Sequence, residues 1–140
     1  MFNTHALRML GAAVITFAAF SGLAQADTVP AKNWQTGLHR TDLLRKDLDA
    51  EREVIQVRVD FEPGIASPNH EHPGVEVAYV ISGTFEYQLQ GQPPVTLKAG
   101  DSLYIPEGTA HVAKNIGTES ASELATYIVK KGQPLVVVKP

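Results

Sequence analysis

The sequence predicts an all-β fold, a sandwich or barrel of short strands, and two observations lead to this prediction. First, apolar and polar side chains alternate over residues 55–62, which is typical of a strand with one buried face. Second, the chain beyond this strand is a series of short β-rich runs separated by turns, most of which contain glycine or proline. Runs of this kind favour β-sheets packed on each other over units in which helices connect parallel strands.

The expected strands can be placed in order along the chain. Residues 41–53, with the sequence TDLLRKDLDAERE, are charged and allow two interpretations. Leu43, Leu44 and Leu48 fit one face of a short helix only loosely, and a strand followed by a polar turn is the alternative. The strands expected after this segment cover residues 54–61, 75–81, 84–89, 95–97, 102–105, 111–115, 124–129 and 135–138.

Residues 1–26 have the features of a secretory signal peptide. Arg8 lies near the start, the apolar block LGAAVITFAAF follows, and Ala24-Gln25-Ala26 forms a small-x-small cleavage pattern. The apolar block is shorter than the roughly 20 residues that a helix needs to span a bilayer. The mature protein is therefore expected to be periplasmic or secreted. Three parts are predicted: a signal peptide over 1–26, an N-terminal lead-in with the first strand or strands over 27–53, and a β-barrel over 54–140.

Composition excludes several classes of function. The chain has no cysteine, so thiolate nucleophiles, thiolate metal ligands and disulfides are excluded. The formal net charge is −3, and no basic run is longer than the pair Lys130-Lys131. A weakly acidic chain without a basic cluster does not attract a phosphate backbone, so nucleic acid is not an expected partner. No later segment of the sequence is apolar enough to span a membrane, so no membrane association is expected once the leader is removed.

Two histidines one residue apart indicate a metal site. Side chains at positions i and i+2 of a strand point to the same face, so His70 and His72 share one face. Glu76 joins them if the intervening Pro-Gly turn keeps the alternation. His111 opens another expected strand after another proline-containing turn, and it is the candidate for a fourth ligand. Imidazoles and a carboxylate on one concave surface suit a divalent first-row metal.

The spacing of these residues resembles the two motifs of the cupin superfamily. The first motif, a glycine, His-x-His, a glutamate and a closing glycine, is met by Gly64, His70, His72, Glu76 and Gly83. The second motif, a glycine, Pro-x-Gly, a histidine and an asparagine, is met without departure by Gly100, Pro106, Gly108, His111 and Asn115.

The resemblance implies a fold, a ligand set and a range of functions. It implies a double-stranded β-helix, or jelly-roll barrel, in which His70, His72, Glu76 and His111 bind one divalent metal. Fe(II) or Mn(II) is favoured, with zinc and nickel as alternatives. The implied partner is a small-molecule ligand or substrate, and pairing through edge strands implies a homodimer. One implied function is a dioxygenase-like oxidoreductase acting on a small organic substrate. The alternative is a non-catalytic module that binds a metal or a small ligand.

Residues around the motifs carry weaker hypotheses. Asn115 is interpreted as a structural hydrogen-bonding residue, and His39 as an ordinary surface histidine. Asn69 and Glu71 flank the histidines and either support them or are solvated. Two larger sets stay open: aromatic residues that line a ligand pocket or fill the core (Trp34, Tyr79, Tyr87, Tyr104), and candidate general acids (Glu62, Glu86, Tyr104).

We expect the leader to be removed between Ala26 and Asp27. N-terminal sequencing of the protein purified from its native host should begin at Asp27, because the small-x-small pattern places the cleavage there. A mature protein that begins at Met1 or Phe2 would contradict the predicted export.

Overall fold

The computed structural model describes residues 35–140, and within them the chain is entirely β-structure. The leader, its cleavage site and Trp34 lie outside the described residues, and none of the residues in 35–140 forms a helix that could cross a membrane. The ten strands are β1 (Leu38–Asp47), β2 (Arg52–Phe61), β3 (His70–Glu71), β4 (Gly74–Ser82), β5 (Thr84–Leu89), β6 (Val95–Lys98), β7 (Ser102–Ile105), β8 (His111–Asn115), β9 (Ala121–Lys130) and β10 (Val137–Val138).

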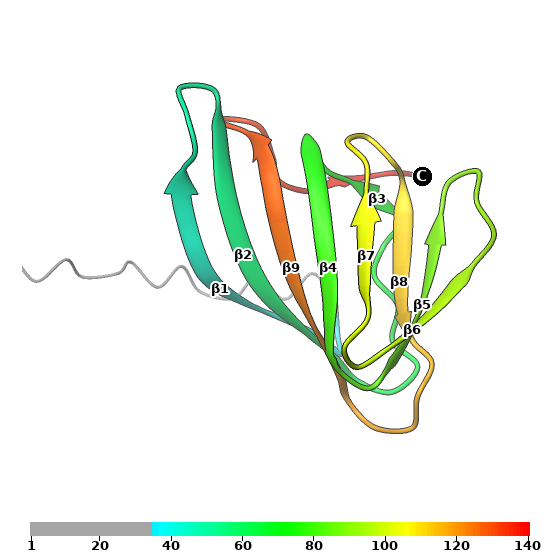
Figure 1. The fold of residues 1–140 in the computed structure, drawn as a ribbon. Helices are drawn as coiled ribbons and strands as arrows, with labels where there is room; N and C mark the ends of the chain where they lie inside the picture. Colours follow the sequence, from blue (N-terminus) through cyan, green and yellow to red (C-terminus); the bar gives the residue numbers. More distant parts are fainter. Residues whose placement is uncertain (1–34) are drawn as a thin grey trace, which may run out of the picture.

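The strands form two five-stranded antiparallel sheets. The first sheet has the order β1-β2-β9-β4-β7 and the second has the order β10-β3-β8-β5-β6 (Figure 1). From β3 to β5 and again from β7 to β9, each strand lies in the sheet opposite its predecessor. This alternation winds the chain into a jelly-roll barrel, so the expected all-β, double-stranded β-helix fold is confirmed.

The charged segment at residues 41–53 forms a strand and a turn, and the helical alternative is wrong. Strand β1 pairs with β2 along its length, from Leu38 opposite Phe61 to Asp47 opposite Glu53. The Asp49 carboxylate accepts hydrogen bonds from the backbone N–H groups of the two residues Glu51 and Arg52. Such an aspartate turn ends β1 and reverses the chain into β2. The pairing with β2 outweighs the loose helical spacing of the leucines.

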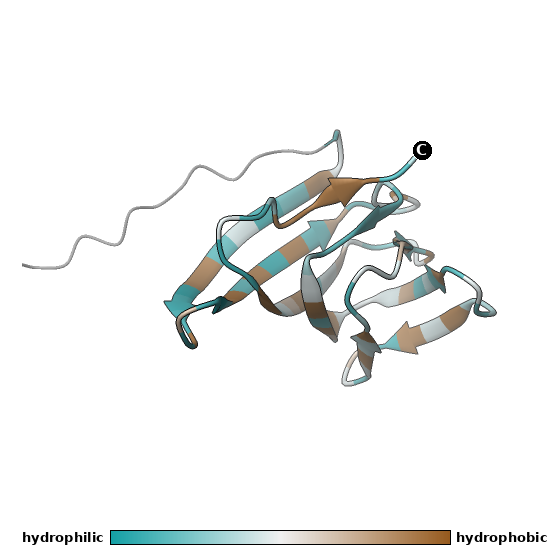
Figure 2. Cartoon of the chain, turned by 90° about the horizontal axis from the view of Figure 1, so that it is seen from above, coloured by the Kyte–Doolittle hydropathy of each residue, from teal (hydrophilic) through white to brown (hydrophobic). Residues whose placement is uncertain are grey.

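The hydrophobic core fills the space between the two sheets. Apolar and polar residues alternate along the long strands in Figure 2, as a half-buried sheet requires. The alternation predicted for residues 55–62 places Val57, Val59 and Phe61 in this core. Phe61 meets Phe85 of the opposite sheet edge to face, with ring centroids 5.1 Å apart. Both sheets therefore contribute side chains to one core.

Two glycines bring backbone segments together near the start and the end of β4. At Gly74, a Cβ atom would lie 2.1 Å from the carbonyl oxygen of Ile128 in β9, so no larger residue fits. At Gly83, φ is +81° and a Cβ would lie 2.5 Å from the Cβ of Ala121. Gly74 thus fixes the start of β4 against β9, two residues before Glu76.

Asn115 ties the end of β8 to neighbouring loops. Its side chain is fully buried, and its Nδ2 donates hydrogen bonds to the carbonyl oxygens of Phe61, Glu62 and Glu119. Its Oδ1 accepts a hydrogen bond from the N–H of Gly117. These contacts agree with the structural role expected for this residue. They hold β8, which carries His111, against the end of β2.

Candidate metal centre

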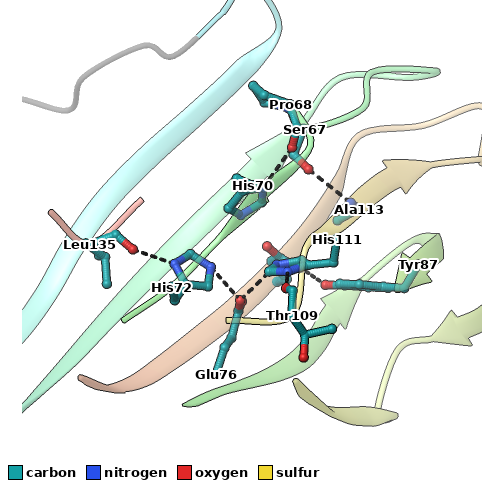
Figure 3. Close-up of polar contacts among 11 residues, drawn as sticks. Ser67, Pro68, His70, His72, Glu76, Tyr87, Thr109, His111, Ala113 and Leu135 are labelled. Carbon is teal, nitrogen blue, oxygen red and sulfur yellow. Dashed lines mark hydrogen bonds and ion pairs between the residues drawn. The ribbon is translucent and has the colours of Figure 1, made fainter. Parts of the chain in front are cut away.

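Three elements from both sheets bring the four motif residues together in the barrel interior. His70 lies in β3 and pairs directly with His111 of β8, while His72 follows the end of β3. Glu76 comes from β4 of the opposite sheet, and the Glu76 side chain faces inward (Figure 3). The turn before β4 therefore keeps the alternation. All four residues are buried, with at most 5% of their surface exposed.

The side chains converge closely enough to share one ion. Ligand atoms of the three histidines all lie within 4.8 Å of one another. Oε2 of Glu76 lies 2.9 Å from Nε2 of His72 and 3.2 Å from Nε2 of His111. The structure therefore brings together all four residues that the sequence predicted as ligands.

Backbone carbonyls fix which nitrogen of each imidazole carries the proton. Nδ1 of His70 lies 2.7 Å from the carbonyl oxygen of Pro68, and Nδ1 of His111 lies 2.9 Å from that of Thr109. Nδ1 of His72 lies 2.6 Å from the carbonyl oxygen of Leu135. A carbonyl only accepts hydrogen bonds, so each Nδ1 donates, and in the neutral ring Nε2 holds a lone pair. Metal-bound histidines are commonly oriented by such contacts.

Two buried atoms at the centre have no hydrogen-bond partner. Nε2 of His72 and Oε2 of Glu76 are both unsatisfied, although they lie only 2.9 Å apart. The distance is that of a hydrogen bond, but a neutral His72 has its proton on Nδ1, so two lone pairs face each other. Such an arrangement is costly in a buried site unless positive charge, either a second proton on the imidazole or a metal ion, lies between the atoms. Nitrogen donors with one carboxylate oxygen are a donor set that fits a divalent first-row metal.

Burial and mutual interactions set the pKa values at this centre. Burial, together with the nearby His111 and His72, lowers the pKa of His70 to about 4. Burial would raise the pKa of Glu76, but the hydrogen bonds and positive charge that His111 and His72 supply when they carry a second proton outweigh it and lower the pKa to about 2. Burial would lower the pKa of His111, yet the Glu76 carboxylate raises it above 6.5. His70 and Glu76 are thus in the ligating form at neutral pH, while a proton on His111 competes with a cation.

The candidate general acids predicted from the sequence do not reach this centre. The Glu62 side chain is 57% exposed and lies 3.6 Å from the exposed His39, which is the surface histidine it was expected to be. Glu86 lies on the outward face of β5, between the inward Phe85 and Tyr87. Tyr104 is 60% exposed.

The two polar residues that flank the histidines also lie outside the barrel. Asn69 and Glu71 line a surface groove of about 680 Å³. Oε1 of Glu71 forms an ion pair with Nζ of Lys139 at 2.8 Å, and the Asn69 carbonyl accepts a hydrogen bond from the N–H of Lys139. Both residues contact the C-terminal segment, and no direct contact with the candidate ligands is among these interactions.

The tyrosines expected to line a pocket or fill the core fall into two groups. Tyr79 and Tyr104 are exposed on the outer face of the first sheet, so they neither line a pocket nor fill the core. Tyr87 is buried between the sheets, where its hydroxyl donates a hydrogen bond to Glu123. Of these three tyrosines, only Tyr87 reaches the small cavity beside His70, Glu76 and His111.

Two residues near the centre were missed by the sequence analysis. Glu123 and Tyr127 both point inward from β9, and the Tyr127 ring centroid lies 4.7 Å from that of His72. The alternation of Ala121, Glu123, Ala125 and Tyr127 was the available signal, since it puts a carboxyl on an otherwise apolar face. Placing the start of this strand at Leu124 hid that signal.

The fold and the buried histidine cluster define a two-sheet jelly-roll barrel with a candidate metal centre. A family model described as "Cupin domain" matches residues 57–128, just over half of the chain, and the chain therefore belongs to the cupin family. The resemblance found in the two sequence motifs is thereby confirmed.

Individual relatives are similar over part of their length. A germin-like protein (subfamily 2 member 1) of Arabidopsis thaliana is 36% identical over 78 residues, covering 50% of this chain and 34% of the relative. The dimethylsulfoniopropionate lyase DddQ of Ruegeria pomeroyi is 33% identical over 51 residues, covering 36% and 25%. This chain thus spans between a quarter and about a third of these two relatives. A solved oxalate oxidase in complex with the substrate analogue glycolate has a TM-score of 0.55 and 28% identity, covering 61% of this chain and 45% of that one.

We expect metal affinity to fall as the pH is lowered through the raised pKa of His111. The group is protonated below that pKa in the metal-free protein, so the cation must displace the proton, and affinity should drop by up to tenfold per pH unit. Isothermal titration with Mn(II) from about pH 8 to about pH 6, in two buffers of different ionisation enthalpy, counts the released protons. An affinity that stays constant over this range would contradict the competition at His111.

Proposed function

We propose that the protein binds one divalent metal through His70, His72, His111 and Glu76. The observation that carries this proposal is the buried approach of Nε2 of His72 to Oε2 of Glu76, which lacks a hydrogen bond. Three neutral imidazoles and one carboxylate leave a divalent ion with a net charge of +1, which suits a buried site. Fe(II) or Mn(II) is favoured because one hard carboxylate oxygen joins the three nitrogens, and zinc and nickel are the alternatives.

We further infer an oxidoreductase that uses dioxygen on a small organic substrate. A bound metal of this kind supplies open coordination positions and a Lewis acid. Similarity to two proteins named as oxalate oxidases, one of them a solved structure, supports the reaction class. The cavity beside the candidate ligands has a volume of only about 10 Å³, which favours substrates of a few heavy atoms, such as short organic acids, over ring compounds.

A non-catalytic metal-binding module is the second candidate, and one observation favours it. The four candidate ligands are at most 5% exposed, and the cavity beside them has a volume of only about 10 Å³. Such a closed site holds an ion well but gives little room for a substrate. Both candidate functions include export to the periplasm or beyond, which is inferred from the leader pattern at residues 1–26.

Replacing any one of the three histidines by alanine should weaken Mn(II) binding more than a hundredfold. Loss of a direct ligand should exceed the 10–100-fold typical of residues that only support one. With metal at about 100 times the wild-type Kd, each variant should also lose the ~2.7 kcal/mol that the bound ion adds to stability. Dialysis with elemental analysis and thermal melts measure both effects. His39→Ala is the matched control, since this histidine is exposed and away from the centre.

Glu76→Gln separates a direct carboxylate ligand from a supporting one. The amide keeps the shape and one oxygen but removes the charge, so Mn(II) affinity should fall by more than tenfold. X-ray absorption of the loaded wild type should then show an oxygen ligand from Glu76 within about 2.5 Å of the metal. A metal that lies beyond this distance from Glu76 in a structure of the loaded protein would leave three histidines as the protein ligands.

Oxygen uptake decides between the two candidate functions. Protein loaded with Fe(II) or Mn(II) should consume dioxygen with at least one compound from a panel of short hydroxy and keto acids, catechols and flavonoids. The response should be strongest for the short acids, and His111→Ala treated in the same way should show none. Wild-type protein that holds one metal per chain and consumes no oxygen with any compound would favour the non-catalytic module.

We also propose that the protein forms a homodimer through the outer face of the first sheet. Val77, Tyr79, Ile81 and Tyr104 are 39–60% exposed there, beside the edge strand β7, which has one side unpaired. A second copy that covers this surface would bury the exposed apolar side chains and shield the unpaired edge strand from aggregation. Sedimentation analysis should show twice the mass of the mature chain, and Tyr104→Lys should shift it to the monomer. A wild-type monomer at high concentration would refute the dimer.

A further inference from the structure

The three candidate histidine ligands differ in the origin of the carbonyl that orients each ring. His70 and His111 are each oriented by a backbone carbonyl only two residues earlier in the chain, so that carbonyl moves together with its histidine. The carbonyl that orients His72 belongs to Leu135, 63 residues away. Among the three histidines, His72 is therefore the one whose orientation depends on a distant part of the chain.

Leu135 belongs to a C-terminal strap, which we define as residues 132–140 and which follows β9 and contains β10. Figure 3 shows Leu135 on the side of His72 that faces away from Glu76. The two ring nitrogens agree with this view, because Nδ1 contacts the Leu135 carbonyl and Nε2 lies beside Glu76. The Leu135 side chain is partly buried and packs against the hydrophobic core. The strap thus lies against the outer side of one candidate ligand.

Only a few contacts hold the strap beyond Leu135. Strand β10 has two residues and is the edge strand of its sheet, where it pairs with β3. Its residues Val137 and Val138 are 38% and 63% exposed. Lys139 adds an ion pair with Glu71, in which both side chains are partly exposed. A short ladder of exposed residues opens at a lower cost in free energy than the long ladders of the core.

The candidate ligands are too deeply buried for an ion to reach them while the chain keeps this conformation. Each is at most 5% exposed, and the cavity beside them measures only about 10 Å³. Some segment must therefore move aside. Strands β4 and β8, which carry Glu76 and His111, are nine and five residues long and are paired on both sides. The strap is the weaker barrier, and its release affects the orientation of His72 alone among the three histidines.

We propose that the C-terminal strap gates the entry and release of the metal. The proposal rests on metal binding by the four candidate ligands. When β10 detaches from β3, Leu135 leaves His72, and the ring loses its anchor and can turn away from Glu76. The ion passes while the strap is open, and the returning Leu135 carbonyl orients His72 again. Leu135 is thus a positioning residue that acts on the metal through His72.

A gate has a kinetic signature that a purely supporting segment lacks. If the strap is closed nearly all the time with and without metal, weakening it raises the rates of metal association and release by the same factor. The Kd then stays constant, because the metal does not bias the opening equilibrium. A strap that only supports His72 in the bound state would instead change the release rate and the Kd together.

A disulfide across β10 and β3 tests the gate directly in the full chain. Val137 and Glu71 are direct partners in the ladder, and the chain has no cysteine of its own, so Val137→Cys with Glu71→Cys creates a single possible disulfide. Release of Mn(II) into excess chelator is followed by elemental analysis after desalting. The oxidised protein should release Mn(II) about tenfold more slowly, or slower still, than the same protein reduced with a phosphine, because the locked ladder cannot open.

Lys139→Ala tests the gate in the opposite direction. Loss of a partly exposed ion pair should accelerate both Mn(II) association and release by about two- to fivefold, while the Kd stays the same. Quenching of intrinsic fluorescence measures association, since the Tyr127 ring lies 4.7 Å from that of His72. Lys139→Arg keeps the charge and should behave like the wild type. Arg58→Ala is the matched control, because it breaks a partly exposed ion pair with Asp60 on β2.

The outcomes separate this proposal from the proposed function. The gate is refuted if the wild type holds one Mn(II) but the oxidised and reduced cysteine variants release it at the same rate. It is also refuted if Lys139→Ala changes the Kd through release alone, or changes neither rate. If the two cysteines do not join, Lys139→Ala decides alone. A wild-type protein that binds no Mn(II) would refute the metal centre itself, and the gate with it.

Discussion

The arrangement on which the rest of the structure depends is the burial of a carboxylate among three oriented imidazoles. Removing an ionised carboxylate from water costs roughly several kcal/mol, and a neighbouring imidazole offsets this only when a positive charge, from a second proton or a metal ion, lies between the two groups. The structure keeps Oε2 of Glu76 at 2.9 Å from Nε2 of His72. A divalent cation held there would attract both atoms, so metal binding and barrel stability are expected to be coupled. The coupling matters more in a chain without cysteine, where no disulfide stabilises the fold.

The barrel supplies the geometry that this arrangement needs. His70 and His111 are direct cross-strand partners in one sheet, and Glu76 faces them from the other. The imidazoles are oriented by backbone carbonyls from separate turns, and the carbonyl that holds His72 belongs to Leu135, 63 residues away. The C-terminal segment is therefore part of the support of the centre. The Glu71–Lys139 ion pair and the short β10 strand hold that segment in place.

The sequence predicted the local features of the site but few of its contacts between residues that are far apart in the chain. Alternation predicted most strands, and it placed His70 and His72 on one face. Spacing alone left His111 as a candidate, and only the second motif joined it to the others. The carbonyl anchors could not be predicted, because every residue has a carbonyl and only the folded chain decides which one meets an imidazole. Glu123 was missed because the pairing of β9 with β2 and β4, which sets its true start, is formed by residues far away in sequence.

Two buried carboxyls in one polar cluster are driven to opposite protonation states. The imidazoles of His111 and His72 lower the pKa of Glu76, while burial and the charge on Glu76 raise the pKa of Glu123. One group is then an anion that can hold a cation, and the other is a neutral acid that can donate a hydrogen bond. When the surroundings shift the pKa values of two carboxyls in opposite directions, one group can act as an anion and the other as an acid.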